Sequence, residues 1–200
     1  MWVQEIEYLE KGKTKVYLSS GEIWMLYRSE IRQFDLQEET DLTDEVYDRI
    51  REEVLLKRVK KRAMYLLEKM DRTEQGLRKK LSEQEYPPDL IDAAIAYVKS
   101  FHYIDDKRYA GAYVRCRAEK KSKGKLRMEL IHKGIPKSIA DEVLEEELSG
   151  RDEEGLITEL LRKRNYDSDH ATIQEKRRMY GYLLRRGFGS NDICKALNCQ

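Results

Sequence analysis

The feature that most constrains the fold of this chain is an internal repeat. Three segments, 77–95, 126–144 and 179–197, start 49 and 53 residues apart and share one spacing of apolar residues. In each, a leucine is followed five residues later by an apolar anchor, and nine residues after that by another apolar residue. These positions are Leu81, Tyr86 and Ile95; Leu130, Ile135 and Leu144; and Leu183, Phe188 and Leu197. The pattern predicts a helix, a tight turn and a second helix in each segment.

The turns carry their own signal. Gly134 and Gly187 precede the apolar anchors of the second and third segments, where a left-handed residue commonly ends a helix. The first segment has Glu85 there, which predicts either a cost in stability or a different turn. We expect the second helices to be opened by capping residues, and these are Asp89, Ser138 and Asn191.

A further helix precedes each pair, so the pattern predicts three tandem three-helix units. These leading helices are expected to end near residue 70, to span about 106–121 and to span about 153–164. We predict a mainly α fold, an elongated tandem array of three-helix repeats preceded by a small N-terminal antiparallel β-meander. The predicted domains are 1–42, 43–102, 103–150 and 151–200. Such arrays are stabilised by contacts between neighbouring repeats and expose long faces, which are typical of binding proteins.

The N-terminal segment differs from the rest of the chain. Residues 2–27 are rich in aromatic and β-branched residues and are interrupted by two turn-like stretches. This composition predicts a three-stranded meander with Trp2, Ile6 and Tyr8 on one face. A sheet of this size is too small to be stable alone, so we expect it to pack on the helices that follow or on a partner.

Two helices are expected next. Ser29 is predicted to cap a short helix ending at Phe34, and Thr43 to cap a long amphipathic helix over 44–70. The long helix has acidic residues in its first half and a basic second half, with Lys57, Arg58, Lys60, Lys61 and Arg62. This order complements the helix dipole, which accounts for part of it.

Charge is strongly segregated along the chain. Residues 107–133 contain ten Lys or Arg and two acids, a local net charge of +8, although the whole chain carries only +1. Residues 162–186 form a second basic zone of +5, and residues 141–154, predicted as an acidic helix, carry −7. Closely spaced cations repel one another unless phosphates or carboxylates offset them. Tyr109 and Tyr113 lie one helical turn apart in the basic stretch and are either an inward stripe or part of its surface.

The basic residues are therefore the predicted binding surface. The predicted contact residues for DNA are Arg115, Arg117, Lys120, Lys121, Lys123, Lys125 and Arg127, followed by Arg177, Arg178, Arg185 and Arg186. The second helices of the repeats open with acidic residues, which does not suit a reader of the major groove. We expect any contact with single- or double-stranded DNA to be made to the phosphate backbone.

No catalytic or metal-binding set stands out. Cys116, Cys194 and Cys199 are odd in number and form no CxxC pair, which argues against disulfides and structural zinc. Asp105 and Asp106 are better explained as a helix cap than as paired catalytic carboxylates. The run at 121–125 lacks the second glycine of a phosphate loop and the Ser or Thr that follows its lysine. We predict no enzyme, no cofactor, no metal and no small-molecule substrate.

Targeting signals are also missing from the sequence. The apolar runs are only a few residues long, and the N-terminus lacks the pattern of a signal peptide. We predict a cytoplasmic protein with no membrane partner.

The central stretch resembles the signature of the RecX family of bacterial recombination regulators. The matching residues are Tyr103 to Asp106, Arg108 to Ala110, Tyr113, Arg115, Gly124, Leu126, Arg127, Leu130 and Lys133 to Ile135. Segments 63–81 and 183–197 resemble the first and last repeats of that family, so the resemblance covers about 63–197. Glu85 departs from the pattern.

The resemblance implies a non-catalytic regulator of the RecA recombinase. Such a protein is expected to lie in the groove of the RecA filament on DNA and to inhibit or disassemble it, which modulates recombination, DNA repair and the SOS response. Two alternatives stay open. One is a general nucleic-acid-binding helical repeat protein that contacts phosphates without RecA, and the other is a scaffold that binds only proteins.

Overall fold

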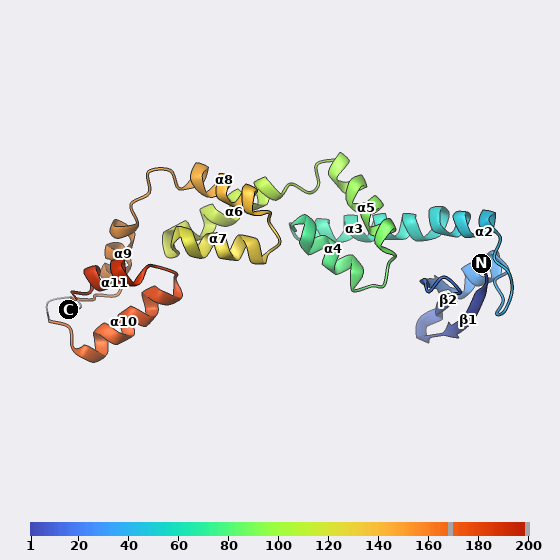
Figure 1. The fold of residues 1–200 in the computed structure, drawn as a ribbon, viewed down its shortest axis with the longest axis horizontal. Coiled ribbons are helices and arrows are strands. Elements are labelled where there is room, and N and C mark those ends of the chain that lie inside the picture. Colours follow the sequence, from blue (N-terminus) through green and yellow to red (C-terminus); the bar gives the residue numbers. More distant parts are fainter. Residues whose placement is uncertain (168–169, 199–200) are drawn as a thin grey trace. The chain divides into compact units, whose positions relative to one another are not determined.

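The computed structural model describes residues 1–167 and 170–198. The chain is mainly helical and begins with a small antiparallel sheet, as predicted (Figure 1). It divides into two compact units, Met1–Asp105 and Asp106–Gln200. Within the described residues, no helix is long and apolar enough to cross a membrane.

The sheet contains β1 (Val3–Tyr8), β2 (Lys13–Leu18) and β3 (Ile23–Tyr27) in the order β1-β2-β3, with the short turn η1 (Glu10–Gly12) between the first two strands. All pairs are antiparallel. The prediction that Trp2, Ile6 and Tyr8 share one face holds for Ile6 and Tyr8, which pair with Val16 and Thr14 on the buried side of β2. It was wrong for Trp2, because the register shifts between Val3 and Glu5 and Val3 is buried in its place. Tyr8 is 57% exposed although it lies on this face.

The helices that follow the sheet differ from prediction in one cap. Helix α1 spans Arg28–Gln33, and Tyr27 is its capping residue, with its N–H donating to Glu30 Oε2 at 2.8 Å. Ser29 lies inside the helix and does not cap it. Thr43 caps the next helix as predicted, since its Oγ1 accepts a hydrogen bond from the Val46 N–H at 3.3 Å.

The long helix predicted over 44–70 is present as three consecutive segments. They are α2 (Asp44–Arg49), the π-helical segment η2 (Ile50–Leu56) and α3 (Lys57–Lys69). The backbone stays in the right-handed helical region at both junctions. The predicted length was therefore correct, and the wider turn in the middle has no counterpart in the sequence pattern.

The first unit has one continuous core. Helix α3 packs with α4 (Glu74–Ser82) and α5 (Pro88–Ser100), and the sheet contributes to the same buried cluster. Trp24 and Leu18 of the sheet and Leu81 of α4 are fully buried in this core. The sheet therefore packs on the helices of its own chain.

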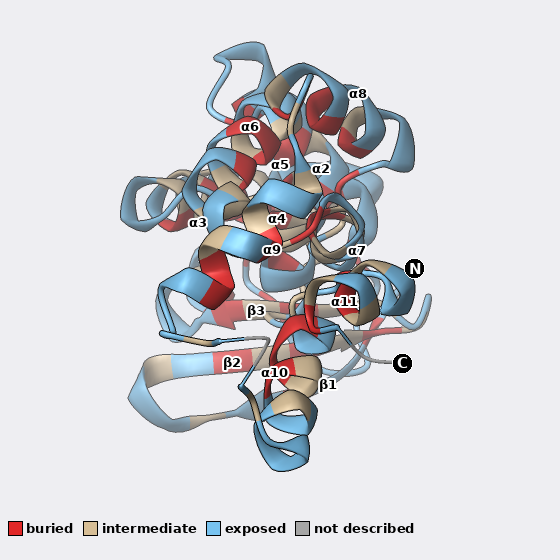
Figure 2. Ribbon diagram, turned by 90° about the vertical axis from the view of Figure 1, so that its left-hand side faces the viewer, coloured by how far each residue is buried: buried red, intermediate tan, exposed pale blue. Residues whose placement is uncertain are grey.

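The second unit holds two further three-helix groups. The first consists of α6 (Asp106–Arg117), the turn η3 (Ala118–Lys120), α7 (Lys123–His132) and α8 (Lys137–Glu147). The other consists of α9 (Glu153–Arg162), α10 (Ile173–Arg185) and α11 (Ser190–Ala196). Each has its own buried cluster, and Figure 2 shows buried residues alternating with exposed ones along these helices.

The repeat anchors lie where the spacing predicted them. Leu81, Leu130 and Leu183 are fully buried. Ile135 and Phe188 are almost fully buried, at 2% and 3% exposure. Tyr86 is half-buried.

The residue that ends the first helix of each pair adopts the same left-handed backbone in all three units. The φ angle is +59° at Glu85, +87° at Gly134 and +84° at Gly187. The first repeat therefore differs from the other two in the type of residue at this position, and the conformation of the turn is the same.

Two further predictions were wrong. The capping residues of α5, α8 and α11 are Pro87, Pro136 and Gly189. Asp89, Ser138 and Asn191 each lie at the second position of their helix instead. The acidic segment 141–154 is also not one helix, because α8 ends at Glu147 and α9 begins at Glu153. The four domain boundaries stay a prediction.

Candidate nucleic-acid interface

The junction between α6 and α7 is fixed by one buried serine. Ser122 is 2% exposed, and its Oγ accepts the N–H of Lys125 at 3.1 Å, which caps α7. The same hydroxyl donates to the Gly187 carbonyl at 2.6 Å, and the Ser122 N–H donates to the Arg186 carbonyl at 3.1 Å. The run at 121–125 is thus a helix cap docked on the turn between α10 and α11.

This docking brings together basic residues that are far apart in the sequence. Ser122 and Lys125 contact the turn at Arg186 and Gly187, which directly follows Arg185 at the end of α10. We call this region the junction surface and define it by Lys120, Lys121, Lys123, Lys125, Arg185 and Arg186. The approach is close, since a Cβ at Gly187 would lie 2.5 Å from the Cβ of Lys125. Glycine is therefore required there by both space and backbone angle.

Two residues outside the predicted contact set, Arg151 and Glu153, hold the junction from the other side. The Arg151 Nη2 donates to the carbonyls of Ala118 and Lys121 at 2.6 and 2.7 Å. The Lys123 N–H donates to the Glu153 carboxylate at 2.6 Å. Both partners come from the segment before or at the start of α9, so they tie the third three-helix group to the second. No spacing rule links positions thirty residues apart in this way.

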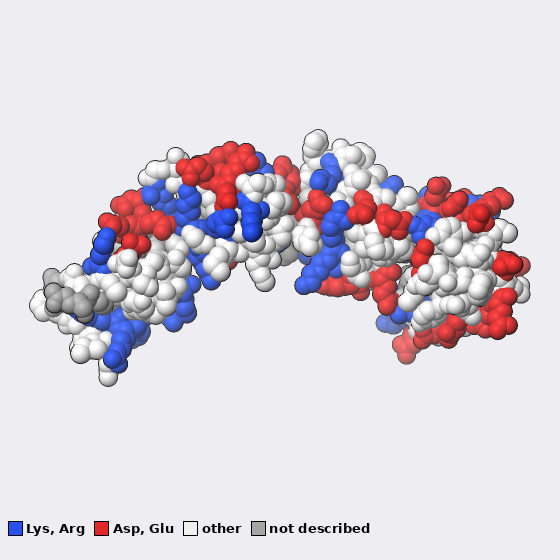
Figure 3. Space-filling view, viewed as in Figure 1, with Lys and Arg blue, Asp and Glu red and all other residues white. Residues whose placement is uncertain are grey.

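Four of the predicted contact residues in the central stretch are already paired with carboxylates. Lys121 contacts Glu129 at 2.6 Å, and Lys123 contacts Glu145 at 2.7 Å. Arg127 binds both oxygens of Asp141 at 2.5 and 2.9 Å, and Arg115 pairs with Glu147. Figure 3 shows acidic side chains gathered over α8 with basic side chains next to them. Carboxylates of the chain itself therefore already offset the positive charge of these four residues, and no phosphate is required there.

The other predicted residues of this stretch have no carboxylate within ion-pair distance among the described residues. Lys120 is exposed, Lys125 is half-buried, and Arg117 stacks on the ring of Tyr113 with its guanidinium 4.0 Å from the ring centroid. These three cations can meet an external anion without first giving up an internal one.

The tyrosines of α6 form part of this framework. The rings of Tyr109 and Tyr113 stack with centroids 6.4 Å apart, and the Tyr113 hydroxyl donates to Glu129 at 2.9 Å. Burial and this hydrogen bond raise the pKa of Tyr113 to about 12. Burial alone would raise the pKa of Glu129, but hydrogen bonds from Lys121 and Tyr113 lower it. Both groups keep their ordinary charge at neutral pH, which suits a structural role.

The second predicted cluster is split along α10. Arg177 and Arg178 are exposed in its first half, and Arg185 is exposed at its end. Eight residues separate Arg177 from Arg185, or about 12 Å along the helix axis. Arg186 is half-buried and lies 3.8 Å from the ring centroid of Tyr182, with Arg164 at 3.9 Å from the same ring. Only Arg185 and Arg186 join the junction surface.

Comparison with known proteins assigns the chain to a family. Family models for the first, second and third three-helix domains of RecX match residues 60–97, 105–144 and 152–197. The chain belongs to the RecX family.

Curated RecX proteins and solved RecX structures agree. The regulatory protein RecX of Clostridium acetobutylicum is 34% identical over 142 residues, which cover 69% of this chain and 66%, just under two thirds, of that protein. That of Clostridium beijerinckii is 25% identical over 191 residues, covering 93% and 88%. A crystal structure of regulatory protein RecX superposes with a TM-score of 0.62 at 25% identity, covering 100% of this chain and 99% of the other. RecX from Lactobacillus salivarius shares the fold, with a TM-score of 0.60 at 23% identity and coverage of 72% and 94%.

The residues of the central RecX signature are mostly structural in this chain. Ile104, Ala110, Leu126, Leu130 and Ile135 are buried. The signature cations at 115 and 127 belong to the ion pairs with α8. The recognisable RecX residues therefore build the repeat, and the residues left free for binding are less conspicuous in the sequence.

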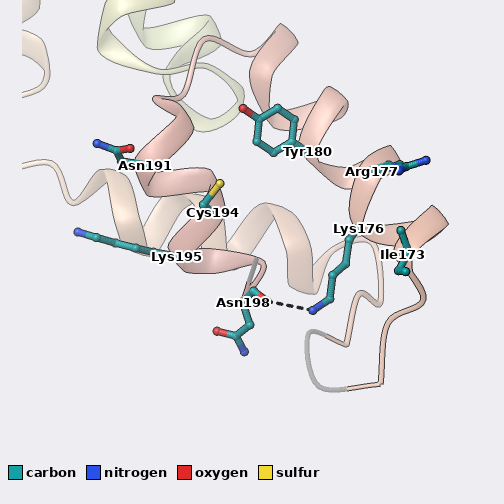
Figure 4. A pocket seen from close by; sticks show the side chains of 8 residues that line it. All are labelled: Ile173, Lys176, Arg177, Tyr180, Asn191, Cys194, Lys195 and Asn198. Atoms are coloured by element: carbon teal, nitrogen blue, oxygen red, sulfur yellow. Dashed lines mark hydrogen bonds between the residues drawn. The ribbon is translucent and has the colours of Figure 1, made fainter. Parts of the chain in front are cut away.

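An open groove lies between α10 and α11 of this RecX protein (Figure 4). Its volume is about 1080 Å³, and its walls include Arg177, Tyr180, Cys194 and Lys195. Ile173 at its edge is 71% exposed, and the Lys176 Nζ donates to the Asn198 carbonyl at 3.0 Å. Arg177 thus faces a groove of its own and is separate from the junction surface.

Within residues 1–167 and 170–198 of this RecX chain, no group of three His, Cys, Asp or Glu could hold a metal ion. Cys116 is exposed and Cys194 is half-buried, both as free thiols, and Cys199 lies outside the described residues, as does Asp169 of the second basic zone. Helix α6 begins at Asp106, as expected if the acidic pair marks a helix start.

Proposed function

We propose that this RecX protein binds the RecA filament on DNA and inhibits or disassembles it, and thereby modulates recombination, DNA repair and the SOS response. It acts without catalysis, cofactor or metal, in the cytoplasm. Membership of the RecX family supports a regulatory role. The observation that carries the proposal is the junction surface, where hydrogen bonds from Ser122 unite two basic segments of the sequence.

The pairing of cations with carboxylates of α7 and α8 shapes how this surface acts. Lys120, Lys125 and Arg185 are available to phosphates, whereas Lys121 and Lys123 must exchange a carboxylate for a phosphate. Each phosphate neutralised contributes a slope of roughly −0.7 to −0.9 in log affinity against log salt. We therefore expect a modest salt dependence, set by about three contacts and not by the eleven cations predicted from the sequence. The displaced carboxylates, Glu129 of α7 and Glu145 of α8, can meet a basic or polar protein surface, which favours a partner that presents both DNA and protein.

The direct test is the single-stranded-DNA-dependent ATP hydrolysis of the cognate RecA. This protein is titrated from far below stoichiometric amounts at fixed, moderate salt. Inhibition at low ratios supports filament regulation and favours action at filament ends or gaps. No inhibition at any ratio, with both proteins folded, contradicts the proposal. Tight binding of bare DNA in the same assay without any effect on RecA supports the alternative of a general nucleic-acid-binding repeat protein.

Charge reversal then tests the surface itself. Lys120→Glu and Arg185→Glu together are expected to abolish inhibition, because both side chains are exposed and have no carboxylate partner among the described residues. Lys121 is unsuitable for charge reversal, since a glutamate there would face Glu129 and disturb the fold. Lys137→Glu, an exposed cation at the start of α8, is the matched control and should leave inhibition unchanged. Full inhibition by the double variant would remove the junction surface from the binding site.

A further inference from the structure

A second basic site lies in the first unit and shares no residue with the junction surface. A groove of about 680 Å³ is lined by residues of the sheet, of α3 and of the turn between α4 and α5. Its walls include three cations, Lys13, Lys61 and Arg62, and three aromatic rings, Tyr27, Tyr65 and Tyr86. The helix dipole accounts for part of the positive charge in the second half of the helix predicted over 44–70. It does not explain the aromatic rings that lie beside these cations.

The acids of this groove are neutralised by residues that do not line it. Glu85 pairs with Lys15 at 2.8 Å, and Glu83 pairs with Lys80 at 2.6 Å. A further lining cation, Arg58, is bound by Glu30 and by the Met25 carbonyl, both at 2.5 Å, so it is a structural residue.

The remaining cations have no such partner. Lys13, Lys61 and Arg62 have no carboxylate within ion-pair distance among the described residues, and the buried Nε of Arg62 has no hydrogen-bond partner there. The groove therefore keeps a net positive charge that its own carboxylates do not cancel.

The rings beside these cations are unusually open. Tyr27 is 43% exposed and Tyr65 is 48% exposed. The guanidinium of Arg62 lies 5.4 Å from the ring centroid of Tyr65, and that of Arg58 lies 4.9 Å from the centroid of Tyr27. Tyr86 is half-buried at the back of the groove, and burial raises the pKa of its hydroxyl. The Lys69 ammonium also lies 5.4 Å from the ring centroid of Tyr65. Two exposed tyrosine rings in a groove that also holds cations without a carboxylate partner suit a ligand with both flat rings and negative charges.

We propose that this groove binds single-stranded nucleic acid, with phosphates on Lys13, Lys61 and Arg62 and bases stacked on Tyr27 and Tyr65. Stacking on aromatic side chains along a positively charged groove is how proteins bind single strands without sequence preference. In a duplex the base faces are already stacked on each other, so the tyrosines favour the single strand. An acidic peptide would satisfy the cations but would leave the tyrosine faces without a matching surface. This inference does not depend on the junction surface of the second unit.

The test measures binding of a short fluorescent oligothymidine to the full chain at fixed salt. Tyr65→Ala is expected to weaken binding roughly 5- to 100-fold, the range for losing one stacked base. Binding of a duplex of the same length should change much less. Circular dichroism confirms that the variant is folded, and alanine is well tolerated on an exposed helix position.

Tyr8→Ala is the matched control. Tyr8 is also exposed and also lies near an arginine, with the guanidinium of Arg28 5.3 Å from its ring centroid. It pairs with Thr14 across the sheet, whereas Lys13 pairs with Tyr27, so these two pairs face opposite sides. Tyr8→Ala should bind oligothymidine like the unaltered protein, and an equal loss for both variants would contradict the proposal.

Photo-crosslinking with an oligonucleotide that carries 5-iodouracil locates the contact. Cross-links on Tyr27 or Tyr65 support the groove, and cross-links confined to residues 106–200 overturn it. Competition by polyglutamate tests the remaining alternative, in which the groove binds an acidic protein segment and not nucleic acid. If polyglutamate displaces the oligonucleotide and Tyr65→Ala has no effect, the groove is a site for acidic protein and the proposal fails.

Discussion

At the scale of single residues, the left-handed turn positions show how local backbone geometry and tertiary contact combine. Gly187 has a φ of +84°, and its missing side chain leaves room for Lys125 and Ser122. Gly150 has a φ of +70°, but an added Cβ there would meet nothing within 4 Å. The two glycines therefore share a backbone requirement, and only Gly187 has a packing requirement in addition.

This difference gives the first prediction. Gly150→Ala should lower the free energy of unfolding by about 1–2 kcal/mol, the cost of a left-handed alanine. Gly187→Ala should lower it by about 2–4 kcal/mol, because overpacking adds to the same backbone cost. Urea unfolding followed by circular dichroism measures both. Equal losses would show that the contact with Lys125 relaxes freely.

Glu85 makes the same turn without glycine. Replacing it changes the side chain carried by a left-handed backbone position and also removes the ion pair with Lys15. A comparison of two variants separates these two effects. Glu85→Gly should be more stable than Glu85→Ala by about 1 kcal/mol, since both lose the carboxylate and only alanine keeps the strained backbone. Denaturant unfolding of the pair tests this. Alanine as stable as glycine would mean that the turn opens when the ion pair is lost.

At the scale of helices, the acidic α8 and the basic α6 and α7 neutralise each other. Asp141 is the clearest case, because hydrogen bonds from Arg127 hold its pKa below the ordinary 3.8. A pKa that is lower in the folded chain means that this carboxylate contributes stability above the unfolded pKa. The contribution is lost as the pH falls through the folded pKa.

The pairing predicts a specific change in titration. Arg127→Gln should raise the pKa of Asp141 toward 3.8, as followed by NMR of its carboxyl carbon. Arg162→Gln is the matched control on another helix. It should instead raise the pKa of Glu159, which Arg162 lowers to about 2, and leave Asp141 unchanged. A pKa of Asp141 that does not respond to Arg127→Gln would show that the two side chains do not pair in solution.

The spacing of leucines and glycines was enough to predict which segments form helices, because it records local periodicity and turn geometry. It could not predict how the helices are capped. Pro87 and Pro136 precede their helices without any side-chain cap, so the more obvious Asp89 and Ser138 were chosen wrongly.

The contacts of the proposed binding surface were less predictable still. Charge density marks the basic stretch in the sequence, but the ion pairs of Arg115 and Lys123 with α8 link positions 32 and 22 residues apart. The hydrogen bond from Ser122 to Gly187 spans 65 residues. Such contacts depend on how helices pack and leave no periodic signal in a single sequence.

At the scale of the whole molecule, the two units are separate cores within one chain. The sheet and the first three-helix group share one buried cluster, and the second unit holds two others. Both tryptophans of the chain, Trp2 and Trp24, lie in the first unit. Tryptophan fluorescence therefore reports the unfolding of the first unit alone, whereas far-ultraviolet circular dichroism reports both.

The last prediction uses this arrangement. Trp24 is fully buried, so Trp24→Ala should destabilise the first unit by about 3–5 kcal/mol, whereas the exposed Trp2→Ala should change its stability by less than about 1 kcal/mol. In Trp24→Ala, hydrogen exchange should speed up throughout α3 to α5 and stay slow in α7 and α8. Loss of protection in α7 and α8 as well would show that the units unfold together. If they stay independent, the junction surface and the groove of the first unit can be inactivated one at a time, which makes the tests of the two binding proposals separable.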